Sequence, residues 1–547
     1  MNNTEDRPLI VQSDRSLMLD VHSPSADSCR NSIMAFSELV KAPEHVHTYA
    51  ISAISLWNAA SAGLSAQEIL ARLDSWTKFP VPENVSSYIT DITSRFGKLV
   101  LVPGDGTPYR LEVKDPFIAK VLASDKTLSG LLHRTDEKDV FSVSLYDRGT
   151  AKLELIRRSY PVDDRIPISA PENVPMKMKA SLRDYQSLAV DSVLGDMGPG
   201  TGFGTVVMPC GSGKTVVGLG IMERLRTRTL ILCPNVVAVR QWINEIKAKT
   251  DIPEDIVGEY SGEKKEIRPV TVCTYQVLTY RSQKTDEYEH MKTIMEGNWG
   301  LVIYDEVHML PAPVFKITAE LQSVYRIGLT ATLIREDGRE GDVFSLVGPK
   351  RYDIPWTDLS RKGWIANAYC IEVRIPLPDD LELPYAVAQR REKYRLASTN
   401  PRKETVLEAL LAKHKGDSII IIGQYLDQLK QVHKTTGYPI ITGSTSNARR
   451  EELYSLFREG KEKVLIVSKV ANYAIDLPDA SVAIQISGTF GSRQEEAQRL
   501  GRILRPKKKS SFFYSVISKY TVEEEFSANR QKFLIEQGYS YQTREIG

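Results

Sequence analysis

Residues 210–215 (CGSGKT) combine glycines, a lysine and a hydroxyl in the pattern of a phosphate-binding loop. Glycines let backbone N–H groups wrap around phosphate oxygens, and the start of a following helix adds positive potential. In such a loop Lys214 reaches the β- and γ-phosphates, and Thr215 binds Mg²⁺. Met208 stands where the usual GxxxxGKT pattern has its first glycine. A Gly-rich turn without a ligand is the alternative, but the apolar strand before the loop and the apolar helix after it favour phosphate binding.

Two adjacent carboxylates, Asp305 and Glu306, follow the apolar stretch 301–304 (LVIY). At the tip of a strand Asp305 can hold Mg²⁺, and Glu306 can orient and deprotonate an attacking water. Phosphoryl transfer needs little beyond positioning and charge neutralisation, so these two roles suffice. A solvated strand end is the alternative, and the phosphate-binding loop upstream disfavours it.

A third group of candidate residues lies near the C-terminus, in residues 498–505 (QRLGRILR). Arg502 and Arg505 are three residues apart and share a helix face, so their cations can meet a transition-state phosphate from across a cleft. A basic helix end is the alternative. The run 507–509 (KKK) is either solvated or faces DNA.

Two series of short apolar strands, separated by amphipathic helices, must position these residues. Continuous apolar strands that alternate with helices predict parallel sheets covered on both faces. Two series in tandem therefore predict an α/β fold of two P-loop lobes with a cleft between them. The predicted strands are 204–208, 229–233, 270–274, 301–304 and 326–329, then 418–422, 438–441, 464–467, 482–486 and 512–517.

Residues 1–165 form a separate accessory region in this interpretation. Three amphipathic helices, at 51–60, 66–73 and 85–96, precede a hairpin made of 98–102 and 109–113. Helices followed by a hairpin are typical of a winged-helix-like domain, which can dock on DNA or on a protein. Both partners remain open. Residues 161–175 contain four prolines and predict a linker.

The composition of the 547-residue chain excludes several classes of protein. Lys and Arg number 71 and Asp and Glu 69, a net charge of +2, with 42% hydrophobic and 26% charged residues. These values exclude a largely disordered chain, a small disulfide scaffold and a highly cationic coat protein. The five cysteines form no CxxC pair, the first twenty residues do not resemble a signal peptide, and no apolar run is long enough to span a bilayer. We expect a cytoplasmic protein without a membrane partner.

The order of the motifs resembles that of superfamily 2 helicases. The order runs through 183–186 (RDYQ), 210–215, 305–308 (DEVH), 330–332 (TAT) and the QxxGRxxR pattern at 498–505. Within that superfamily the chain is similar to the bacterial and archaeal XPB type over roughly residues 175–520, and less specifically at 44–49 and 56–58. The segments that carry this closer resemblance are 328–337 (GLTATLIRED), 348–350 (GPK), 467–470 (VSKV), 475–478 (IDLP) and 492–498 (SRQEEAQ).

The resemblance implies two RecA-like lobes, at 166–365 and 366–547, with a short thumb-like insert at about 375–403. It also implies ATP and Mg²⁺ as cofactors, with Gln186 reading adenine. The implied ATP-binding residues are Arg183, Gln186, Gly211, Ser212, Gly213, Lys214, Thr215, Asp476 and Gln498. The implied catalytic residues are Lys214, Asp305, Glu306, Arg502 and Arg505, with Mg²⁺ on Thr215 and Asp305. His308, Thr330 and Thr332 would couple hydrolysis to motion.

DNA contacts are expected on the loops that follow strands. Arg335, Glu336 and Asp337 match the family's RED motif, which is associated with strand separation, although three consecutive charges also suit a solvated turn. Contacts to phosphates and sugars predict binding that is independent of sequence and weakened by salt. Residues 389–395 either contact duplex DNA or form a solvated helix, and the sequence favours neither alternative. The candidate backbone contacts are Arg240, Thr274, Tyr275, Gln424, Gly443, Ser444 and Lys469, each of which could also be an ordinary loop residue.

The resemblance thus implies an ATP-dependent DNA helicase that moves 3′→5′ in DNA repair. We expect a monomer, with a repair nuclease as a partner. Since the sequence ends soon after the second lobe, a prokaryotic context is expected rather than a eukaryotic transcription-factor complex. A duplex translocase without processive unwinding is the main alternative, and RNA as the substrate stays open. A non-enzymatic scaffold is disfavoured because the catalytic residues are retained.

Overall fold

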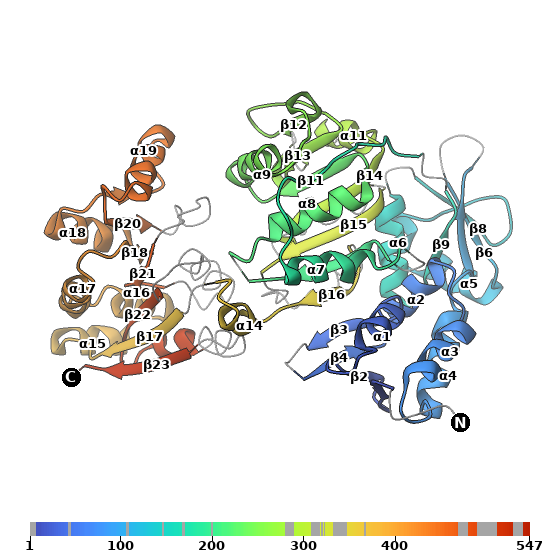
Figure 1. Cartoon of the computed structure of the whole chain (residues 1–547), viewed down its shortest axis with the longest axis horizontal. Coiled ribbons are helices and arrows are strands. Elements are labelled where there is room, and N and C mark those ends of the chain that lie inside the picture. Colours follow the sequence, from blue (N-terminus) through green and yellow to red (C-terminus); the bar gives the residue numbers. More distant parts are fainter. Residues whose placement is uncertain are drawn as a thin grey trace. The chain divides into compact units, whose positions relative to one another are not determined.

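The computed structural model divides the chain into two compact units (Figure 1). Unit 1 comprises Met1–Val207 and Lys214–Asp353, and unit 2 comprises Met208–Gly213 and Ile354–Gly547. The predicted division at 165 and 365 stays a prediction. The residues that the structure describes are 7–41, 45–104, 109–144, 147–166, 170–197, 201–209, 211–278, 280, 289–307, 318, 321, 323–331, 347–365, 368–468, 480–488, 511–528 and 540–546.

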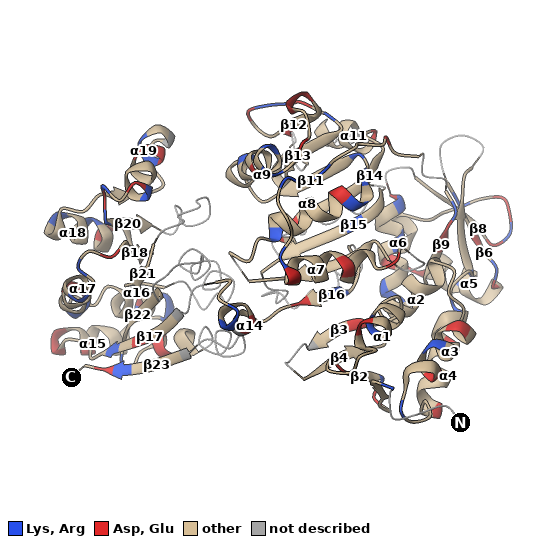
Figure 2. Ribbon diagram, in the orientation of Figure 1, with Lys and Arg blue, Asp and Glu red and all other residues tan. Residues whose placement is uncertain are grey.

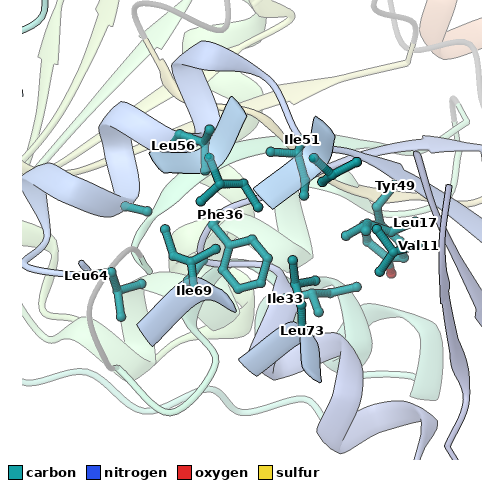
Figure 3. Close-up of a cluster of buried hydrophobic side chains, with 14 of the residues drawn as sticks. Val11, Leu17, Ile33, Phe36, Tyr49, Ile51, Leu56, Leu64, Ile69 and Leu73 are labelled. Atoms are coloured by element: carbon teal, nitrogen blue, oxygen red, sulfur yellow. The ribbon is translucent and has the colours of Figure 1, made fainter. Parts of the chain in front are cut away.

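Unit 1 begins with a four-stranded antiparallel sheet that the sequence did not predict. Its order is β1 (Leu9–Val11), β2 (Ser16–Asp20), β4 (Val46–Ala50) and β3 (Glu38–Lys41). Its helices are α1 (Ala26–Ile33), α2 (Ala53–Ser61), α3 (Ala66–Trp76) and α4 (Glu83–Ser94). Sheet and helices share one apolar core, in which Phe36 lies amid Ile33, Ile69 and Leu73 (Figure 3).

A second sheet of five strands follows in unit 1. Its order is β7 (His133–Arg134), β8 (Val140–Val143), β6 (Tyr109–Val113), β5 (Leu99–Val102) and β9 (Val162–Asp164). Its helices are α5 (Pro116–Ser124), α6 (Arg148–Arg157) and the single 3₁₀ turn Leu128–Gly130. The predicted order of three helices and a hairpin is present as α2, α3, α4, β5 and β6, and the hairpin extends into this sheet.

The prediction of a linker at 161–175 is wrong at its start. Val162–Asp164 forms β9, which pairs in parallel with β5. Arg148 and Lys152 each lie 2.7 Å from a carboxylate oxygen of Asp164, and the Val162 side chain is buried. These contacts hold a short edge strand in a segment whose prolines suggested irregular chain.

Unit 1 also contains a seven-stranded parallel sheet. Its order is β12 (Val257–Tyr260), β13 (Val270–Thr274), β11 (Thr229–Cys233), β14 (Trp299–Asp305), β15 (Ser323–Thr330), β10 (Phe203–Val207) and β16 (Lys350–Asp353). Its helices are α7 (Asp184–Leu194), α8 (Lys214–Leu225), α9 (Val236–Lys249), α10 (Tyr275–Leu278), α11 (Glu289–Met295) and the 3₁₀ turn Glu254–Ile256. All five predicted strands of this lobe are confirmed, and the edge strands β12 and β16 were missed.

The strand β16 also joins this sheet to the N-terminal sheet within unit 1. The buried Arg351 donates from Nη1 to the carbonyl oxygen of Ser37 at 3.2 Å and from Nε to that of Phe203 at 3.2 Å. Lys350 Nζ donates to the carbonyl oxygen of Val40 at 3.0 Å. The segment before β3, strand β3 and the start of β10 are thereby tied to one edge strand.

Unit 2 contains a second seven-stranded parallel sheet. Its order is β19 (Ile440–Ile441), β20 (Val464–Ser468), β18 (Ile419–Gly423), β21 (Val482–Gln485), β22 (Ser511–Ser518), β17 (Ala368–Ile375) and β23 (Ser540–Glu545). Its helices are α14 (Trp356–Arg361), α15 (Asp379–Val387), α16 (Arg390–Ser398), α17 (Arg402–Lys413), α18 (Leu426–Thr436) and α19 (Asn447–Arg458). The five strands predicted for this lobe are confirmed, and β17 and β23 were missed. The region of the predicted insert consists of α15 and α16.

Helices cover the parallel sheets as the apolar strands predicted. In unit 1, α7, α8 and α9 pack on one another and on the strands. Residues of α10 and α11 join another cluster with Leu232, Val302 and Tyr304. The α/β class with two tandem RecA-like lobes is confirmed. Within the described part of the chain, no helix is both long and apolar enough to cross a membrane.

Candidate active site

The predicted phosphate-binding loop connects β10 to α8. Gly211 and Gly213 have φ values of +82° and +85°, in the left-handed region that glycine adopts at little cost. The buried Ser212 donates its hydroxyl to the carbonyl oxygen of Pro209 at 2.6 Å, which closes the turn. Helix α8 begins at Lys214. The backbone of the loop therefore needs the glycines that the sequence places there.

Three strands of the first parallel sheet bring the candidate residues of unit 1 to one edge. Strand β15 lies between β10 and β14, and their pairing places Val207 opposite Thr330 and Leu329 opposite Asp305. Because all three strands run in parallel, their carboxyl ends meet at the same edge, where open α/β sheets bind ligands.

Lys214 and Glu306 meet at this edge. Lys214 Nζ lies 3.4 Å from Glu306 Oε1, and their side chains are only 11% and 18% exposed. Glu306 has a φ of +48°, which is uncommon for a residue with a side chain. The backbone N–H of Ala331 donates to Glu306 Oε2 at 3.4 Å. The segment after β15, predicted to couple hydrolysis to motion, thus contacts the carboxylate predicted to orient water.

Asp305 carries a perturbed carboxyl group. Burial and the adjacent charge of Glu306 raise the pKa of Asp305 to about 6, against the lowering effects of the Trp242 hydrogen bond and of Lys214. Two carboxylates beside one lysine leave excess negative charge in a poorly solvated place. A divalent cation would neutralise that charge, and carboxylate and hydroxyl oxygens are ligands that Mg²⁺ accepts. The residues present therefore fit a magnesium ion.

Arg183 and Gln186 lie at the start of α7. The Arg183 backbone N–H donates to Gln186 Oε1 at 3.0 Å, and the Gln186 side chain is buried. Arg183 Nη1 also donates to the Tyr185 hydroxyl at 3.2 Å. The first of these bonds holds the Gln186 amide in one orientation. Its role in reading adenine stays a prediction.

The predicted DNA contacts differ in exposure. Arg240 on α9 is exposed and pairs with Glu263. Gly443 and Ser444 are exposed at the end of β19. Gln424 is half-buried, and its backbone N–H donates to the Ser487 hydroxyl at 2.8 Å.

Thr274 and Tyr275 are buried, in contrast to Arg240. The Tyr275 hydroxyl donates to the backbone carbonyl oxygen of Asp305 at 2.8 Å. Their side chains therefore face the interior of unit 1, and a DNA contact there would come from the main chain.

Sequence reasoning missed Trp242. Its indole Nε1 donates to Asp305 Oδ2 at 2.9 Å. The sequence signal was only the apolar spacing of Val239, Trp242 and Ile246, which marks the packing face of α9. A buried indole N–H needs a partner, but nothing in the sequence indicated which one.

Several predicted site residues lie outside the described residues, and their roles stay predictions. They are His308, Thr332, Arg335, Glu336, Asp337, Lys469, Asp476, Gln498, Arg502 and Arg505.

Two parallel sheets in tandem, a Gly-rich loop that opens α8 and an Asp-Glu pair at the end of β14 define a P-loop nucleotide hydrolase of the helicase type. The family described as "ERCC3/RAD25/XPB C-terminal helicase" matches residues 359–545. "Helicase conserved C-terminal domain" matches residues 9–137, and "Type III restriction enzyme, res subunit" matches residues 179–335.

Relatives of known name match almost the whole chain. "DNA 3′-5′ helicase XPB" of Mycobacterium tuberculosis is 47% identical over 99% of this chain and 98% of its own length. The protein of the same name from Kineococcus radiotolerans is 46% identical over 98% of this chain and 96% of its own. "General transcription and DNA repair factor IIH helicase/translocase subunit XPB" of Enterocytozoon bieneusi is 34% identical over 99% and 93%. The chain therefore belongs to the XPB family of superfamily 2 helicases.

Proposed function

We propose that this XPB-family helicase hydrolyses ATP to move 3′→5′ along DNA and separate its strands in DNA repair. The observation that carries the proposal is the approach of Lys214 to Glu306 at the carboxyl edge of a parallel sheet, 3.4 Å apart. The names of two bacterial relatives, each a DNA 3′-5′ helicase, support the direction and the substrate.

In the proposed reaction Lys214 binds the β- and γ-phosphates, and Glu306 orients and deprotonates the attacking water. Thr215 and Asp305 would hold Mg²⁺. When bound, this ion would neutralise phosphate charge. The Ala331 N–H donates to Glu306 Oε2 and so links the carboxylate to the end of β15. A movement of this strand end would therefore move the Glu306 carboxylate. We further propose Arg183, Gln186, Asp476 and Gln498 as ATP contacts and Arg502 and Arg505 as arginine fingers, on the family resemblance.

DNA binding in this proposal depends on local contacts. Lys and Arg are spread among Asp and Glu over both units (Figure 2), and the net charge is only +2. Exposed Arg240, Gly443 and Ser444 are proposed to contact the phosphate backbone, with the RED motif separating the strands. Such contacts make binding independent of sequence and weaker as salt rises.

The wider context is proposed on the same resemblance. We propose a monomer that works in the cytoplasm beside a repair nuclease. Light scattering of the purified protein with and without DNA tests the monomer: a total protein mass near 61.4 kDa, that of one chain, is expected in both cases. A stable dimer would contradict it.

Partial duplexes with a single-stranded tail at either the 3′ or the 5′ end test the proposed activity. We expect ATP-dependent unwinding of the 3′-tailed substrate, lost in Lys214→Ala. Lys247→Ala is the matched control, because Lys247 pairs with the exposed Glu254 and has no role in the proposed reaction. Displacement of a triplex strand without unwinding of any tailed duplex would instead identify a duplex translocase.

A further inference from the structure

Asp305 receives hydrogen bonds from two elements that have no part in the phosphate-binding loop. Trp242 on α9 donates its indole N–H to Oδ2 at 2.9 Å. Tyr275, the first residue of α10, donates its hydroxyl to the backbone carbonyl oxygen at 2.8 Å. One bond orients the carboxylate of Asp305 and the other orients its peptide group.

The Trp242 ring occupies a tight position between three elements. It is 1% exposed, and a Cβ atom added to Gly218 of α8 would lie 2.5 Å from its Cη2. The ring thus contacts α8, the helix that begins at Lys214, while its N–H reaches the end of β14. A shift of α9 against α8 must therefore move the donor on Asp305, because densely packed interiors transmit strain.

The Tyr275 bond acts on Glu306. A peptide group is planar, so fixing the carbonyl of Asp305 also fixes the direction of the Glu306 N–H. Glu306 needs such a constraint because its φ of +48° is a conformation that residues other than glycine seldom adopt unaided. Tyr275 is itself held in the cluster of buried side chains that includes Cys273 and Tyr304.

Both elements also carry or adjoin residues that the sequence predicted to contact DNA. The exposed Arg240 precedes Trp242 by two residues on α9, and Thr274 immediately precedes Tyr275. A phosphate bound at either place lies within one short segment of a donor to Asp305. Trp242 and Tyr275 are 33 residues apart in the sequence, yet both donate to this one residue.

We propose that Trp242 and Tyr275 are positioning residues that transmit DNA binding at α9 and at the β13–α10 junction to Asp305 and Glu306. This inference rests on the proposed function, since it assumes that these segments contact DNA. The two hydrogen bonds make the geometry of the hydrolytic residues depend on whether DNA holds α9 and α10 in place.

Two substitutions that remove a donor test the proposal: Tyr275→Phe, which is nearly isosteric, and Trp242→Phe, which also removes part of a buried ring. The matched controls are Trp299→Phe, which removes an indole N–H donated to the Ile294 carbonyl near the other end of β14, and Tyr304→Phe, whose hydroxyl donates to the Thr318 carbonyl at 3.5 Å. If Trp242→Phe fails to fold, Tyr275→Phe and Gly218→Ala, which displaces the Trp242 ring, carry the test.

The first readout is the ratio of ATP hydrolysis rates with and without saturating DNA. We expect each test variant to lower this ratio about tenfold, the effect of one hydrogen bond to a charged or strained group. The controls should keep the ratio of the unaltered protein even if they lower the thermal midpoint. A purely structural role would reduce both rates together and leave the ratio unchanged.

The second readout uses binding alone. Coupling is reciprocal, so a non-hydrolysable ATP analogue with Mg²⁺ should change DNA affinity in the unaltered protein. In Trp242→Phe and Tyr275→Phe this change should shrink towards onefold, while DNA affinity without nucleotide stays within about twofold, because no proposed DNA contact is removed.

The outcomes separate the two proposals. If the unaltered protein neither binds DNA nor is stimulated by it, the proposed function fails. If it is stimulated, and the test variants keep both the stimulation ratio and the nucleotide effect on DNA affinity, only the assignment of Trp242 and Tyr275 is overturned.

Discussion

Lys214 Nζ lies 3.4 Å from Glu306 Oε1, so the lysine of the phosphate-binding loop is the ion-pair partner of the carboxylate proposed to orient water. In the proposed reaction, phosphates that bind Lys214 would compete with Glu306 for its charge. The pair would therefore link occupation of the loop to the availability of the carboxylate. Both residues are mostly buried, which strengthens their interaction relative to an exposed pair.

Glu306→Gln removes the proposed base and keeps the size of the side chain. We expect single-turnover ATP hydrolysis to fall by about 10²-fold or more, the usual contribution of a general base. Nucleotide affinity should be retained or rise, because a negative charge near the phosphates is lost. Glu254→Gln, at an exposed ion pair, is the control. Hydrolysis at the unaltered rate would remove Glu306 from the mechanism.

The second prediction concerns the buried pair of Lys403 and Glu523 in unit 2, which are 1% and 3% exposed and 2.9 Å apart. Lys403→Met leaves the Glu523 charge buried, so the free energy of unfolding of unit 2 should fall by about 3–5 kcal/mol. Urea denaturation measures this loss. Adding Glu523→Leu should recover part of it.

The exposed pair of Lys461 and Glu459 provides the control for this loss. Lys461→Met should change the free energy of unfolding by no more than about 0.5 kcal/mol. Equal effects of Lys403→Met and Lys461→Met would contradict the importance of the buried pair.

The third prediction concerns Arg351, which joins β16 to the N-terminal sheet. Burial lowers the pKa of Arg351 to about 10, so its guanidinium stays charged at neutral pH. Arg351→Met leaves the carbonyls of Ser37 and Phe203 without this donor and should cost roughly 1–3 kcal/mol. Hydrogen exchange should rise in β3 and β16. Arg165→Met, at a more exposed pair, should leave both strands as protected as before.

The fourth prediction is an acid sensitivity of the N-terminal sheet. Burial, with a further contribution from the Arg30 charge, lowers the pKa of His47 to about 4. In the unfolded chain His47 binds a proton near pH 6.5, whereas in the folded chain it binds one only near pH 4. Stability should therefore fall as the pH drops from 6.5 to 4.

His47→Gln removes this titration. The loss of hydrogen-exchange protection in β2 and β4 between pH 7 and pH 5 should be smaller in this variant than in the unaltered protein. His433→Gln, at an exposed histidine of unit 2, should leave this loss as it is. An unchanged loss in His47→Gln would show that His47 does not cause the sensitivity.

The inner strands of the two parallel sheets were predictable because both of their faces are buried. Strands such as β18 and β11 are continuous apolar runs, and periodicity locates them directly. The missed edge strands β12, β16 and β23 are short or polar, since an edge strand has a neighbour on one side only.

β17 was missed for another reason. It carries Glu372, which is fully buried and accepts a hydrogen bond from the Tyr541 hydroxyl at 3.0 Å. Arg374 Nη1 lies 3.4 Å from Glu524 Oε1. Charged residues at alternate positions conceal an inner strand when their partners come from segments that are distant in sequence.

The candidate site divides in the same way. The positions of Lys214 at a helix start and of Glu306 just after a strand were predictable because the glycine loop and the strand end are local patterns, and their roles stay predictions. The contacts of Trp242 and Tyr275 with Asp305 join residues 63 and 30 positions apart, and only packing brings them together. Tyr275 was predicted to contact DNA, whereas its side chain is buried against Asp305.

Initial ATP hydrolysis rates with single-stranded DNA, duplex DNA and RNA, compared at one salt concentration, test the central claim most directly. The account predicts that DNA stimulates hydrolysis more than RNA does, and that Lys214→Ala abolishes hydrolysis with every nucleic acid while Lys247→Ala does not. Hydrolysis that persists in Lys214→Ala, or that DNA fails to stimulate, would contradict an ATP-dependent DNA helicase working through this site.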